Sequence, residues 1–261
     1  MSAAMTSLND RTVLVTGASS GIGEACARAF AARGARVLMA ARRRDRLDAL
    51  AAELEAAGVR AHAFTVDVRV RDEVAALERE LVERALLPDV LVNNAGLSRG
   101  LDRLWEGDPD DWDEMIDTNV KGLLYVTRAF LPHMVAADRG DVVNIGSQAG
   151  HMVYPKGNVY AATKFAVKAL THGGNVDLVG TRVRMSTVDP GMTHTEFSEV
   201  RFHGDKERSD AFYRGYTPLS GADIAEAVCW VVERPPHVHV RDVVLMPIVQ
   251  RNMMVFEDRK K

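Results

Sequence analysis

The sequence predicts an α/β fold in which a parallel β-sheet is covered by helices on both faces. Short apolar, β-branched runs alternate with longer segments in which apolar residues recur at helical spacing, the pattern of repeated βαβ units. Runs such as 13–16 (VLVT) are apolar nearly throughout, as in strands buried on both sides. No linker rich in Pro, Gly or Ser interrupts the 261 residues. We therefore expect one domain over 11–250, with an N-terminal extension at 1–10 and a C-terminal tail at 251–261.

The first half of the chain predicts four strands and three helices. Residues 11–16 (RTVLVT) form the first apolar run, and the segment after them carries Ile22, Cys26 and Phe30 at helical spacing. The expected strands are at 11–16, 35–40, 61–67 and 89–93, and the expected helices at 21–33, 43–57 and 72–84.

The second half continues the alternation, with one exception. The expected helices are at 109–135, 158–178 and 220–233, and the expected strands at 141–146, 182–188 and 242–246. Ser220, followed three residues later by Asp223, is typical of a helix N-terminus. The exception is 191–218, which is too long for an ordinary connection between a strand and a helix. We interpret it as a substrate lid with short helices of its own.

Charge and composition exclude several classes of protein. The chain has 33 basic and 36 acidic residues, a formal net charge of −3, so no nucleic-acid partner is expected. No apolar run approaches the ~20 residues that span a bilayer, and the N-terminus lacks the pattern of a secretory signal. Cys26 and Cys229 lie far apart, which predicts buried thiols and no metal site. We expect a cytoplasmic protein that binds no membrane.

A glycine-rich segment directly follows the first strand and opens the first helix. In TGASSGIG (16–23), Gly17 permits a turn with positive φ, and Gly21 lets the backbone approach a pyrophosphate. The free N–H groups and the dipole of a helix N-terminus favour a phosphate there. The alternative is a plain glycine-rich turn. The place between strand and helix favours a nucleotide site made of Gly17, Ser19, Ser20, Gly21, Ile22 and Gly23.

The end of the second predicted strand indicates which nucleotide binds. An acidic residue about 20 positions after the glycines would bind the adenosine ribose hydroxyls of NAD. The chain has Ala41, Arg42 and Arg43 there instead. The two arginines match the 2′-phosphate of NADP, and the alternative is that they only begin a solvated helix face. We expect NADP(H) as the cofactor.

Tyr160 and Lys164 are candidates for acid–base chemistry. They lie one helical turn apart on the same face of the helix predicted at 158–178. A nearby cation favours the phenolate and lowers the pKa of a tyrosine from its usual value of about 10. Such a phenol protonates a developing alkoxide, or accepts its proton in the reverse direction. The same pair is also common on helix surfaces, so its meaning depends on the motifs around it.

Further motifs accompany these segments in one order and spacing. They are TGASSGIG (16–23), NNAG (93–96), Asn119 within TNVKG, Ser147, the Tyr160–Lys164 pair and Pro190-Gly191. By these motifs the chain resembles the classical short-chain dehydrogenase/reductase family over roughly residues 10–250. The resemblance implies a Rossmann-type, doubly wound sheet of seven parallel strands in a three-layer α/β/α arrangement.

The same resemblance implies roles for four residues in catalysis. Tyr160 would be the acid–base residue, and Lys164 would lower its pKa while bonding the nicotinamide ribose. Ser147 would hold the substrate oxygen, and Asn119 would support a water-linked proton path to Lys164. The alternatives are that Ser147 caps a helix and that Asn119 is a mid-helix polar residue that bonds locally.

The resemblance also implies the remaining cofactor contacts. Asp67 and Val68 would contact the adenine. The adenine and ribose pocket would be shaped by Asn93, Asn94, Ala95 and Gly96. The nicotinamide end of the cofactor would meet Pro190, Gly191, Met192, Thr193 and Thr195.

A closer resemblance concerns the substrate side. Residues 157–160 (GNVY), 196–205 (EFSEVRFHGD) and 246–250 (MPIVQ) resemble the NADP-dependent 3-hydroxy acid dehydrogenases within this family. This implies a small hydroxy acid substrate, such as serine, allo-threonine, 3-hydroxybutyrate or 3-hydroxypropanoate, interconverted with its oxo form. It also implies a homo-oligomer, a tetramer or a dimer.

The candidates for substrate contact lie near the catalytic residues or in the lid: Gln148, His151, Asn158 and Arg201. A guanidinium takes a carboxylate with two parallel hydrogen bonds, so Arg201 is the candidate anchor for a hydroxy acid. Its alternative is a salt bridge to Glu196, Glu199 or Asp205. His151 stands where the family more usually has a small residue, and its alternative is a structural histidine.

Gly173-Gly174 interrupts the predicted catalytic helix. Each glycine costs ~1 kcal/mol against alanine in a helix interior. We interpret the pair as permitting close helix–helix approach in a subunit interface.

Two other functions are open on the sequence. One is a ketoreductase for acyl thioesters, polyols or cyclic alcohols, because substrate choice depends on the lid and pocket more than on the fold. The other is a non-catalytic nucleotide-binding protein. The second would be expected to lack Tyr160 or Lys164, and both are present.

Overall fold

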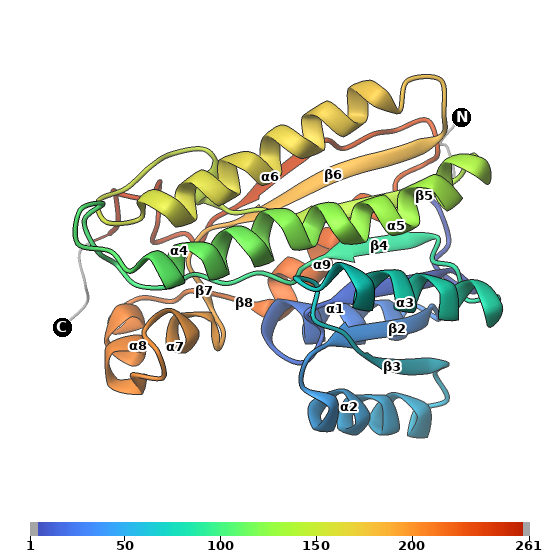
Figure 1. Cartoon of the computed structure of the whole chain (residues 1–261), viewed down its shortest axis with the longest axis horizontal. Coiled ribbons are helices and arrows are strands. Elements are labelled where there is room, and N and C mark those ends of the chain that lie inside the picture. The colour runs from blue at the N-terminus through green and yellow to red at the C-terminus, as the bar shows by residue number, and fades with distance from the viewer. Residues whose placement is uncertain (1–4, 258–261) are drawn as a thin grey trace.

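The structure is a computed structural model that describes residues 5–257, and its centre is a sheet of seven parallel strands (Figure 1). The strands lie in the doubly wound order β3-β2-β1-β4-β5-β6-β9. Their bounds are β1 (Thr12–Thr16), β2 (Arg36–Ala41), β3 (Ala61–Thr65), β4 (Val90–Asn93), β5 (Gly140–Ile145), β6 (Val183–Pro190) and β9 (Asp242–Leu245). The predicted seven-stranded parallel sheet in a single domain is confirmed.

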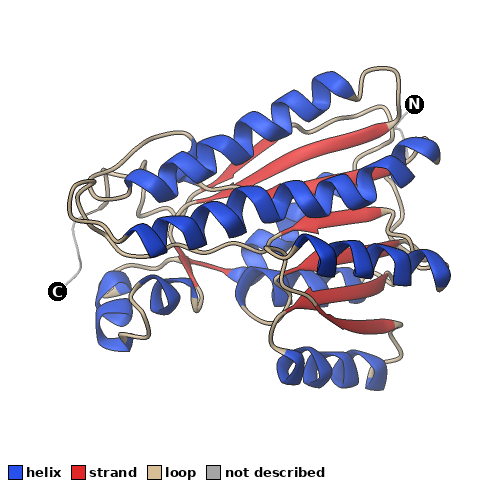
Figure 2. Ribbon diagram, in the orientation of Figure 1, coloured by secondary structure: helices blue, strands red, loops and turns tan. Residues whose placement is uncertain are grey.

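Helices cover both faces of this sheet, as Figure 2 shows. One apolar core joins the sheet to α1, α2 and α9, with Phe30, Leu47 and Ile224 fully buried. A second core lies on the other face against α3 and α5, where Leu81 and Phe130 are fully buried, and α6 packs beside β6 on this face. The helix bounds are α1 (Gly21–Ala31), α2 (Arg44–Ala56), α3 (Arg71–Glu83), α4 (Pro109–Ile116), α5 (Leu123–Ala136), α6 (Asn158–Asp177) and α9 (Gly221–Val232).

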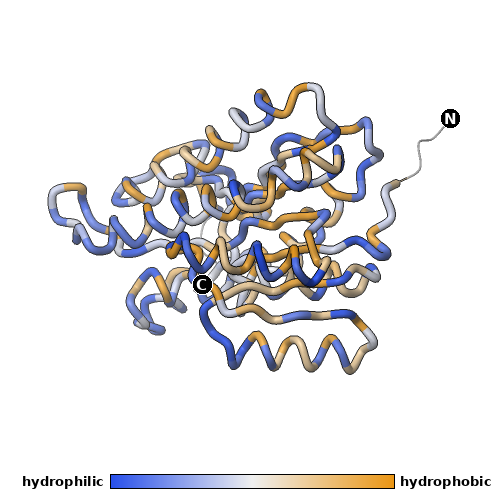
Figure 3. The backbone as a smooth tube through the Cα atoms, turned by 45° about the vertical axis from the view of Figure 1, so that its right-hand side comes forward, coloured by the Kyte–Doolittle hydropathy of each residue, from blue (hydrophilic) through white to orange (hydrophobic). Residues whose placement is uncertain are grey.

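The hydropathy pattern explains why these segments form these layers. The inner strands β1, β4 and β5 are buried along their whole length, which matches the nearly continuous apolar runs of the sequence, whereas the edge strands β3 and β9 are partly exposed. The outer helices bury one stripe only. In Figure 3, hydrophobic and hydrophilic segments alternate along α2, the helix at the bottom of the view, and its buried residues are Leu47, Leu50 and Leu54.

The predicted elements agree with the observed ones to within two residues at each end, apart from one helix. The helix predicted at 109–135 is α4, a π-helical turn η1 (Asp117–Gly122) and α5. The predicted helical stretch is confirmed, because these three elements follow one another without a break, and the π-helical turn within it is the feature that the apolar periodicity did not show. At α9 the expected start is confirmed, because Asp223 N–H donates to Ser220 Oγ at 3.3 Å and Ser220 N–H donates to Asp223 Oδ2 at 2.7 Å.

The long connection after β6 contains the short elements expected of it. These are β7 (Thr193–His194), α7 (Phe197–Arg201) and α8 (Lys206–Tyr213), and β7 pairs with β8 (Leu219–Ser220). In Figure 1, α7 and α8 project beyond the end of the sheet at which β6 finishes.

The two glycines of the pair in α6 have different surroundings. A Cβ at Gly174 would lie 2.8 Å from Met185 Sδ of β6, whereas a Cβ at Gly173 would meet nothing within 4 Å. Gly174 therefore permits close packing of α6 on the sheet of the same chain, which corrects the prediction of a role between subunits for that glycine.

Two properties of residues 5–257 bear on the kind of protein. None of the helices in this range is long and apolar enough to cross a membrane. The same residues contain no group of three or more His, Cys, Asp or Glu side chains that could hold a metal ion.

Candidate active site

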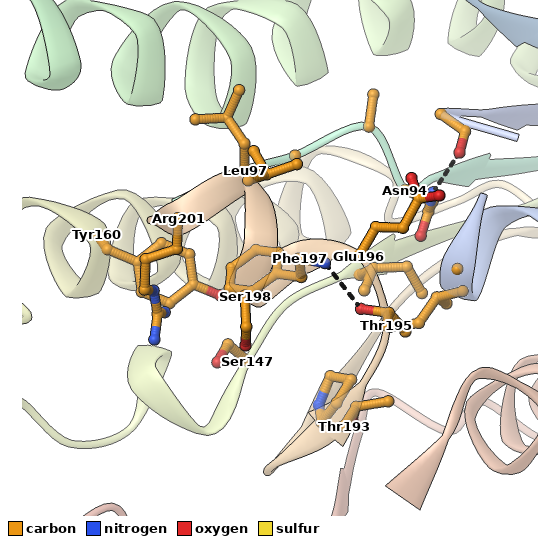
Figure 4. A pocket seen from close by; sticks show the side chains of 18 of the residues that line it. Asn94, Leu97, Ser147, Tyr160, Thr193, Thr195, Glu196, Phe197, Ser198 and Arg201 are labelled. Atoms are coloured by element: carbon orange, nitrogen blue, oxygen red, sulfur yellow. Dashed lines mark hydrogen bonds between the residues drawn. The ribbon is translucent and has the colours of Figure 1, made fainter. Parts of the chain in front are cut away.

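A cavity of about 510 Å³ lies where the strands end. Its lining residues follow β1, β2, β4, β5 and β6, and the segment 191–218 forms the opposite wall. Carboxyl ends of parallel strands are where open α/β sheets bind ligands. In Figure 4, Asn94 lies toward one end of this cavity, and Ser147, Tyr160 and Arg201 lie together toward the other.

Most residues predicted to bind cofactor or substrate line this cavity. They are Gly17, Ser19, Ser20, Gly21, Ile22, Arg42, Arg43, Asp67, Val68, Asn94, Ala95, Gly96, Ser147, Tyr160, Lys164, Pro190, Gly191, Met192, Thr193, Thr195 and Arg201. Six predicted residues lie outside the lining: Gly23, Asn93, Asn119, Gln148, His151 and Asn158.

The glycine-rich loop after β1 has the conformation that its glycines permit. Gly17 and Gly21 have φ of 66° and 58°, a region that side chains with a Cβ rarely adopt. Asn94 holds the loop from behind, since its Nδ2 donates to the carbonyl oxygens of Thr16 and Gly17 at 2.9 and 3.2 Å. A Cβ at Gly23 would lie 2.4 Å from Asn94 Nδ2, so Gly23 supports the loop without lining the cavity. The N-terminus of α1 is thereby left facing the cavity.

The two arginines after β2 differ in their contacts. Arg42 is exposed, lines the cavity and has no ion-pair or hydrogen-bond partner within residues 5–257. Arg43 donates to Ser19 Oγ at 3.1 Å and Ser20 Oγ at 2.6 Å, and it pairs with Glu196 of the lid at 2.9 Å. Burial alone would raise the pKa of Asp67, but hydrogen bonds from Arg69 hold it below its ordinary value. This end of the cavity thus presents a free cation beside an ionised carboxylate.

Ser147, Tyr160 and Lys164 come together from β5 and α6. Ser147 follows β5 and caps the short helix η2 (Gln148–Gly150), accepting a hydrogen bond from Ala149 N–H at 3.0 Å. Lys164 Nζ donates to the Ile145 carbonyl at 2.9 Å and lies 5.9 Å from the centre of the Tyr160 ring. The Tyr160 ring packs edge-on against Phe197 of α7 at 5.6 Å. A phenol and an ammonium are therefore held at one point in the cavity wall.

Burial changes the acidity of both groups. It raises the pKa of Tyr160 to about 12, although the Arg201 guanidinium and the Ser147 hydroxyl act in the opposite direction. It lowers the pKa of Lys164 to about 8, and the carboxylate of Asp189 opposes that shift. Each shift favours the neutral form. The phenol is thus protonated in the protein alone and becomes a proton acceptor only when further positive charge is placed beside it.

Asn119 lies within the π-helical turn η1 and is 2 % exposed. Its Oδ1 accepts from Leu97 N–H at 2.8 Å, and its Nδ2 donates to the Leu97 carbonyl at 2.8 Å and to Thr163 Oγ1 at 3.0 Å. The side chain therefore joins the strand-end loop at Leu97 to the catalytic helix, behind the cavity wall.

Arg201 reaches the cavity from the lid and is 7 % exposed. Its guanidinium lies 5.4 Å from the centre of the Tyr160 ring and 5.1 Å from that of Phe197. Nε donates to Ser98 Oγ at 3.1 Å, and the Tyr154 hydroxyl lies 3.5 Å from Nη2. Among residues 5–257 no carboxylate pairs with it, so the expected alternative of a salt bridge to Glu196, Glu199 or Asp205 is wrong. A buried cation without a counter-ion is left beside the phenol.

A family model, that of the short chain dehydrogenases, matches residues 11–206. The chain belongs to the short-chain dehydrogenase family. It is 46% identical to the NADP-dependent 3-hydroxy acid dehydrogenase YdfG of Salmonella typhi, over 91% of this chain and 95% of the relative. It is 44% identical to sulfoacetaldehyde reductase 2 of Chromohalobacter salexigens, over 91% of this chain and 94% of that protein. The closed form of a serine dehydrogenase complexed with NADP+ superimposes with a TM-score of 0.89 and is 40% identical, covering 95% of this chain and 99% of the other.

Membership of the short-chain dehydrogenase family confirms the resemblance inferred from the motifs and the class of enzyme, an oxidoreductase. Within that frame, three predicted substrate residues lie away from the cavity wall. The Gln148 side chain belongs to η2, and Asn158 Nδ2 donates to the Asp102 carbonyl at 3.0 Å. Asn93, which was predicted to shape the cofactor pocket, also lies away from the cavity wall. It is the last residue of the central strand β4, and its Nδ2 donates to Asn144 Oδ1 at 2.9 Å.

His151, the third of these substrate candidates, lies in a partly buried chain of hydrogen bonds. Lys168 Nζ lies 2.8 Å from His151 Nδ1, and His151 Nε2 lies 2.7 Å from Asp189 Oδ2. A protonated lysine only donates, so Nδ1 accepts and Nε2 carries the proton that bonds Asp189. Both ring nitrogens are occupied, and the geometry agrees with the structural alternative.

Sequence reasoning missed part of the short-chain dehydrogenase site. Gln250 is 3 % exposed, and its Oε1 accepts from Met192 N–H at 2.7 Å. Met253 and Phe256, from the described part of the segment predicted as a tail, also line the cavity. The signal for Gln250 was present, since it ends the MPIVQ motif, whereas no pattern marked the two residues beyond it. Residues 1–4 and 258–261 of the predicted extension and tail lie outside the described residues.

Proposed function

We propose that the protein is an NADP(H)-dependent oxidoreductase that interconverts a small 3-hydroxy acid and its oxo form. The observation that carries the substrate class is Arg201, a buried guanidinium beside the Tyr160 ring with no carboxylate partner among the described residues. A 3-hydroxy acid has its carboxylate two bonds from the reacting carbon. A guanidinium holds such a group with two parallel hydrogen bonds and so fixes its orientation.

The residues of the cavity fit an NADP molecule. The α1 N-terminus and the open conformations of Gly17 and Gly21 suit a pyrophosphate, and Arg42 is free for a 2′-phosphate. A Cβ at Gly96 would lie 3.2 Å from Asn119 Oδ1 and 3.7 Å from Lys164 Nζ, so glycine keeps the middle of the cavity open. When bound, NADP(H) supplies the hydride acceptor or donor. The segment 191–218 is proposed as the lid over it.

The chain's own residues then supply the proton chemistry. In the oxidation direction Tyr160 Oη accepts the hydroxyl proton of the substrate, and in reduction it donates a proton to the developing alkoxide. Ser147 Oγ holds the same substrate oxygen. Lys164 and Arg201 are the two cations that lie 5.9 and 5.4 Å from the Tyr160 ring, and both favour its ionised form. Asn119 is assigned to a water-linked proton path that ends at Lys164.

The anionic group of the substrate need not be a carboxylate. A sulfonate has three oxygens and can present two of them to a guanidinium as a carboxylate does, and a relative at 44% identity is named a sulfoacetaldehyde reductase. The shared chemistry is a short hydroxy or oxo compound with a terminal anion. A neutral ketone of the kind that polyketide or cyclic-alcohol ketoreductases reduce would bring no anion to the buried Arg201, which has no counter-ion among the described residues, and this is unfavourable.

We also propose that the protein is a cytoplasmic homotetramer or homodimer. Two faces support self-association. Phe165 and Val176 of α6 are 42% and 73% exposed, and Trp230 of α9 and Val244 of β9 are each 45% exposed. Light scattering of the purified protein measures the number of subunits, and a monomer would contradict this proposal.

Arg201→Ala tests the substrate class. We expect kcat/KM for 3-hydroxypropanoate to fall about 10–150-fold more than kcat/KM for propan-1-ol, the usual cost of a charged hydrogen-bonded contact. The loss on propan-1-ol measures the removal of the cation beside Tyr160, which both substrates share. The matched control is Arg208→Ala, because Arg208 lies in the same lid over Phe202 at 4.3 Å and does not line the cavity. An equal loss on acid and neutral alcohol would show that Arg201 does not hold the carboxylate, and would overturn the proposed substrate class.

A further inference from the structure

The carboxylate of Glu196 joins the lid to the cofactor end of the cavity. Glu196 immediately precedes α7 and lines the cavity. Its Oε2 accepts from Arg43 Nη1 at 2.9 Å, and its Oε1 accepts from Arg46 Nη1 at 2.5 Å. Both arginines lie at the start of α2, about 150 residues earlier in the chain. One acidic side chain therefore neutralises two cations beside the place where Arg42 is free.

Arg43 is shared between this carboxylate and the glycine-rich loop. Its Nε and Nη2 donate to the hydroxyls of Ser19 and Ser20 at 3.1 and 2.6 Å, so Nη1 is the nitrogen that faces the lid. The Arg43–Glu196 pair is partly open to solvent, with both side chains 40% exposed. Exposed ion pairs add little to stability, so a more highly charged anion displaces one of them readily.

We propose that Glu196 is a cofactor-specificity-determining residue whose carboxylate competes with the 2′-phosphate of NADP for Arg43. The inference rests on the proposed NADP dependence. A phosphomonoester carries about −1.5 to −2 charges near neutral pH and binds a guanidinium through two oxygens. When the 2′-phosphate binds near Arg43, the Glu196 carboxylate either moves away from Arg43 or stays and repels the phosphate. NAD has a hydroxyl at that position and makes no such demand.

The competition has a consequence for the lid. Glu196 lies directly before α7, and α7 contributes Phe197 and Arg201 to the wall beside Tyr160. Binding of NADP therefore leaves Glu196 held to α2 by Arg46 alone, whereas binding of NAD leaves both contacts in place. The cofactor that carries the phosphate is thus the one that loosens the start of the substrate-binding helix.

The test is the binding of both cofactors to Glu196→Gln, measured by isothermal titration calorimetry. Removal of the carboxylate should lower the Kd of NADP+ by roughly 3–10-fold and leave the Kd of NAD+ unchanged. The matched control is Glu199→Gln. Glu199 lies on α7 as well and is exposed, and no side-chain partner is found for it in the described part of the chain. Its variant removes the same charge from the same helix and should leave both constants unchanged.

Hydrogen exchange over residues 195–201 supplies a second readout. In the wild-type protein NADP+ should increase exchange at 195–197 relative to NAD+, and in Glu196→Gln the two cofactors should give the same exchange. If wild-type protein binds NADP+ no more tightly than NAD+, the proposed cofactor is wrong, and this inference falls with it. If NADP+ is preferred but Glu196→Gln leaves the ratio of Kd values unchanged or lowers the preference, only the inference is overturned. Equal shifts in both glutamate variants would indicate a general field effect and would also overturn it.

Discussion

The two ends of the cavity are held by different kinds of contact. At the cofactor end, Gly17 and Asn94 follow strands of the sheet, and Gly17 N–H donates to the Ala40 carbonyl at 2.8 Å. At the substrate end, side-chain bonds add to the backbone bond from Gly100 N–H to the Arg201 carbonyl at 3.0 Å. Ser198 and Tyr213 share a hydrogen bond of 2.5 Å, and Arg99 donates to the Val200 carbonyl at 2.6 Å. Backbone contacts depend little on residue type, whereas side-chain contacts change with each substitution. The lid is therefore the part in which substrate choice can vary while the fold is kept.

The largest expected effect is at the junction of the two ends. Tyr160→Phe should lower kcat by about 10²–10⁴-fold, because the phenolic oxygen that moves the proton is removed. The ring that packs against Phe197 at 5.6 Å is kept, so NADPH should still bind, as fluorescence titration would show. A variant that retained near-full kcat would mean that another group moves the proton. Loss of NADPH binding would mean that the two ends are not separable.

An intermediate effect is expected at the cofactor end alone. Arg42→Ala should weaken NADP binding about 10–150-fold and NAD binding little, because only NADP carries the 2′-phosphate. At saturating NADP, the KM for the substrate should not change. Arg44→Ala is the control, since Arg44 is exposed nearby and pairs with Asp48 at 2.8 Å. An equal loss of affinity for both cofactors would show that Arg42 contacts the pyrophosphate, which both share, or that it stabilises the fold.

The smallest effect is expected away from both ends, in the glycine pair of α6. Gly173→Ala should raise the free energy of unfolding by ~1 kcal/mol, because alanine is the better helix former and its Cβ meets nothing. Gly174→Ala should gain less or lose stability, because Met185, 3 % exposed, must shift inside a packed core. Calorimetric unfolding of the two variants measures the difference. Destabilisation by Gly173→Ala would show that another subunit covers this face.

The same contrast explains how much was predictable from the sequence. The alternating strands and helices and the glycine-rich loop depend on short local patterns, such as 16–23 followed by a helix, and both were predicted correctly. The seven-stranded, doubly wound arrangement was predicted from the family resemblance and not from these patterns. The partners of Arg201 are Ser98 and Tyr154, which lie 103 and 47 residues away in the chain. Its burial depends on how the lid folds back, and no local pattern encodes that.

Two further differences have the same origin. His151 lies beside the site in the sequence, but its partners Lys168 and Asp189 come from α6 and the end of β6 and draw it away from the cavity. The interaction of Glu196 with Arg43 links residues separated by 153 positions, and sequence alone offered Glu196 only as a partner for Arg201. Ion pairs between residues far apart in the chain follow no periodic pattern in the sequence, so they could not be predicted from it.

The π-helical turn η1 constrains the length of the chain more than its composition. Before it, α4 buries Met115 in the cluster that contains Tyr160, and after it, α5 buries Val126 and Phe130 against the sheet. A π-helical turn takes about one residue more than an α-helical turn, so the same residues wound as a regular α-helix would rotate everything beyond them by about 100° relative to α4. The buried stripe of α5 would then face solvent. The wide turn therefore sets the direction in which α5 faces, and with it which side of that helix packs on the sheet.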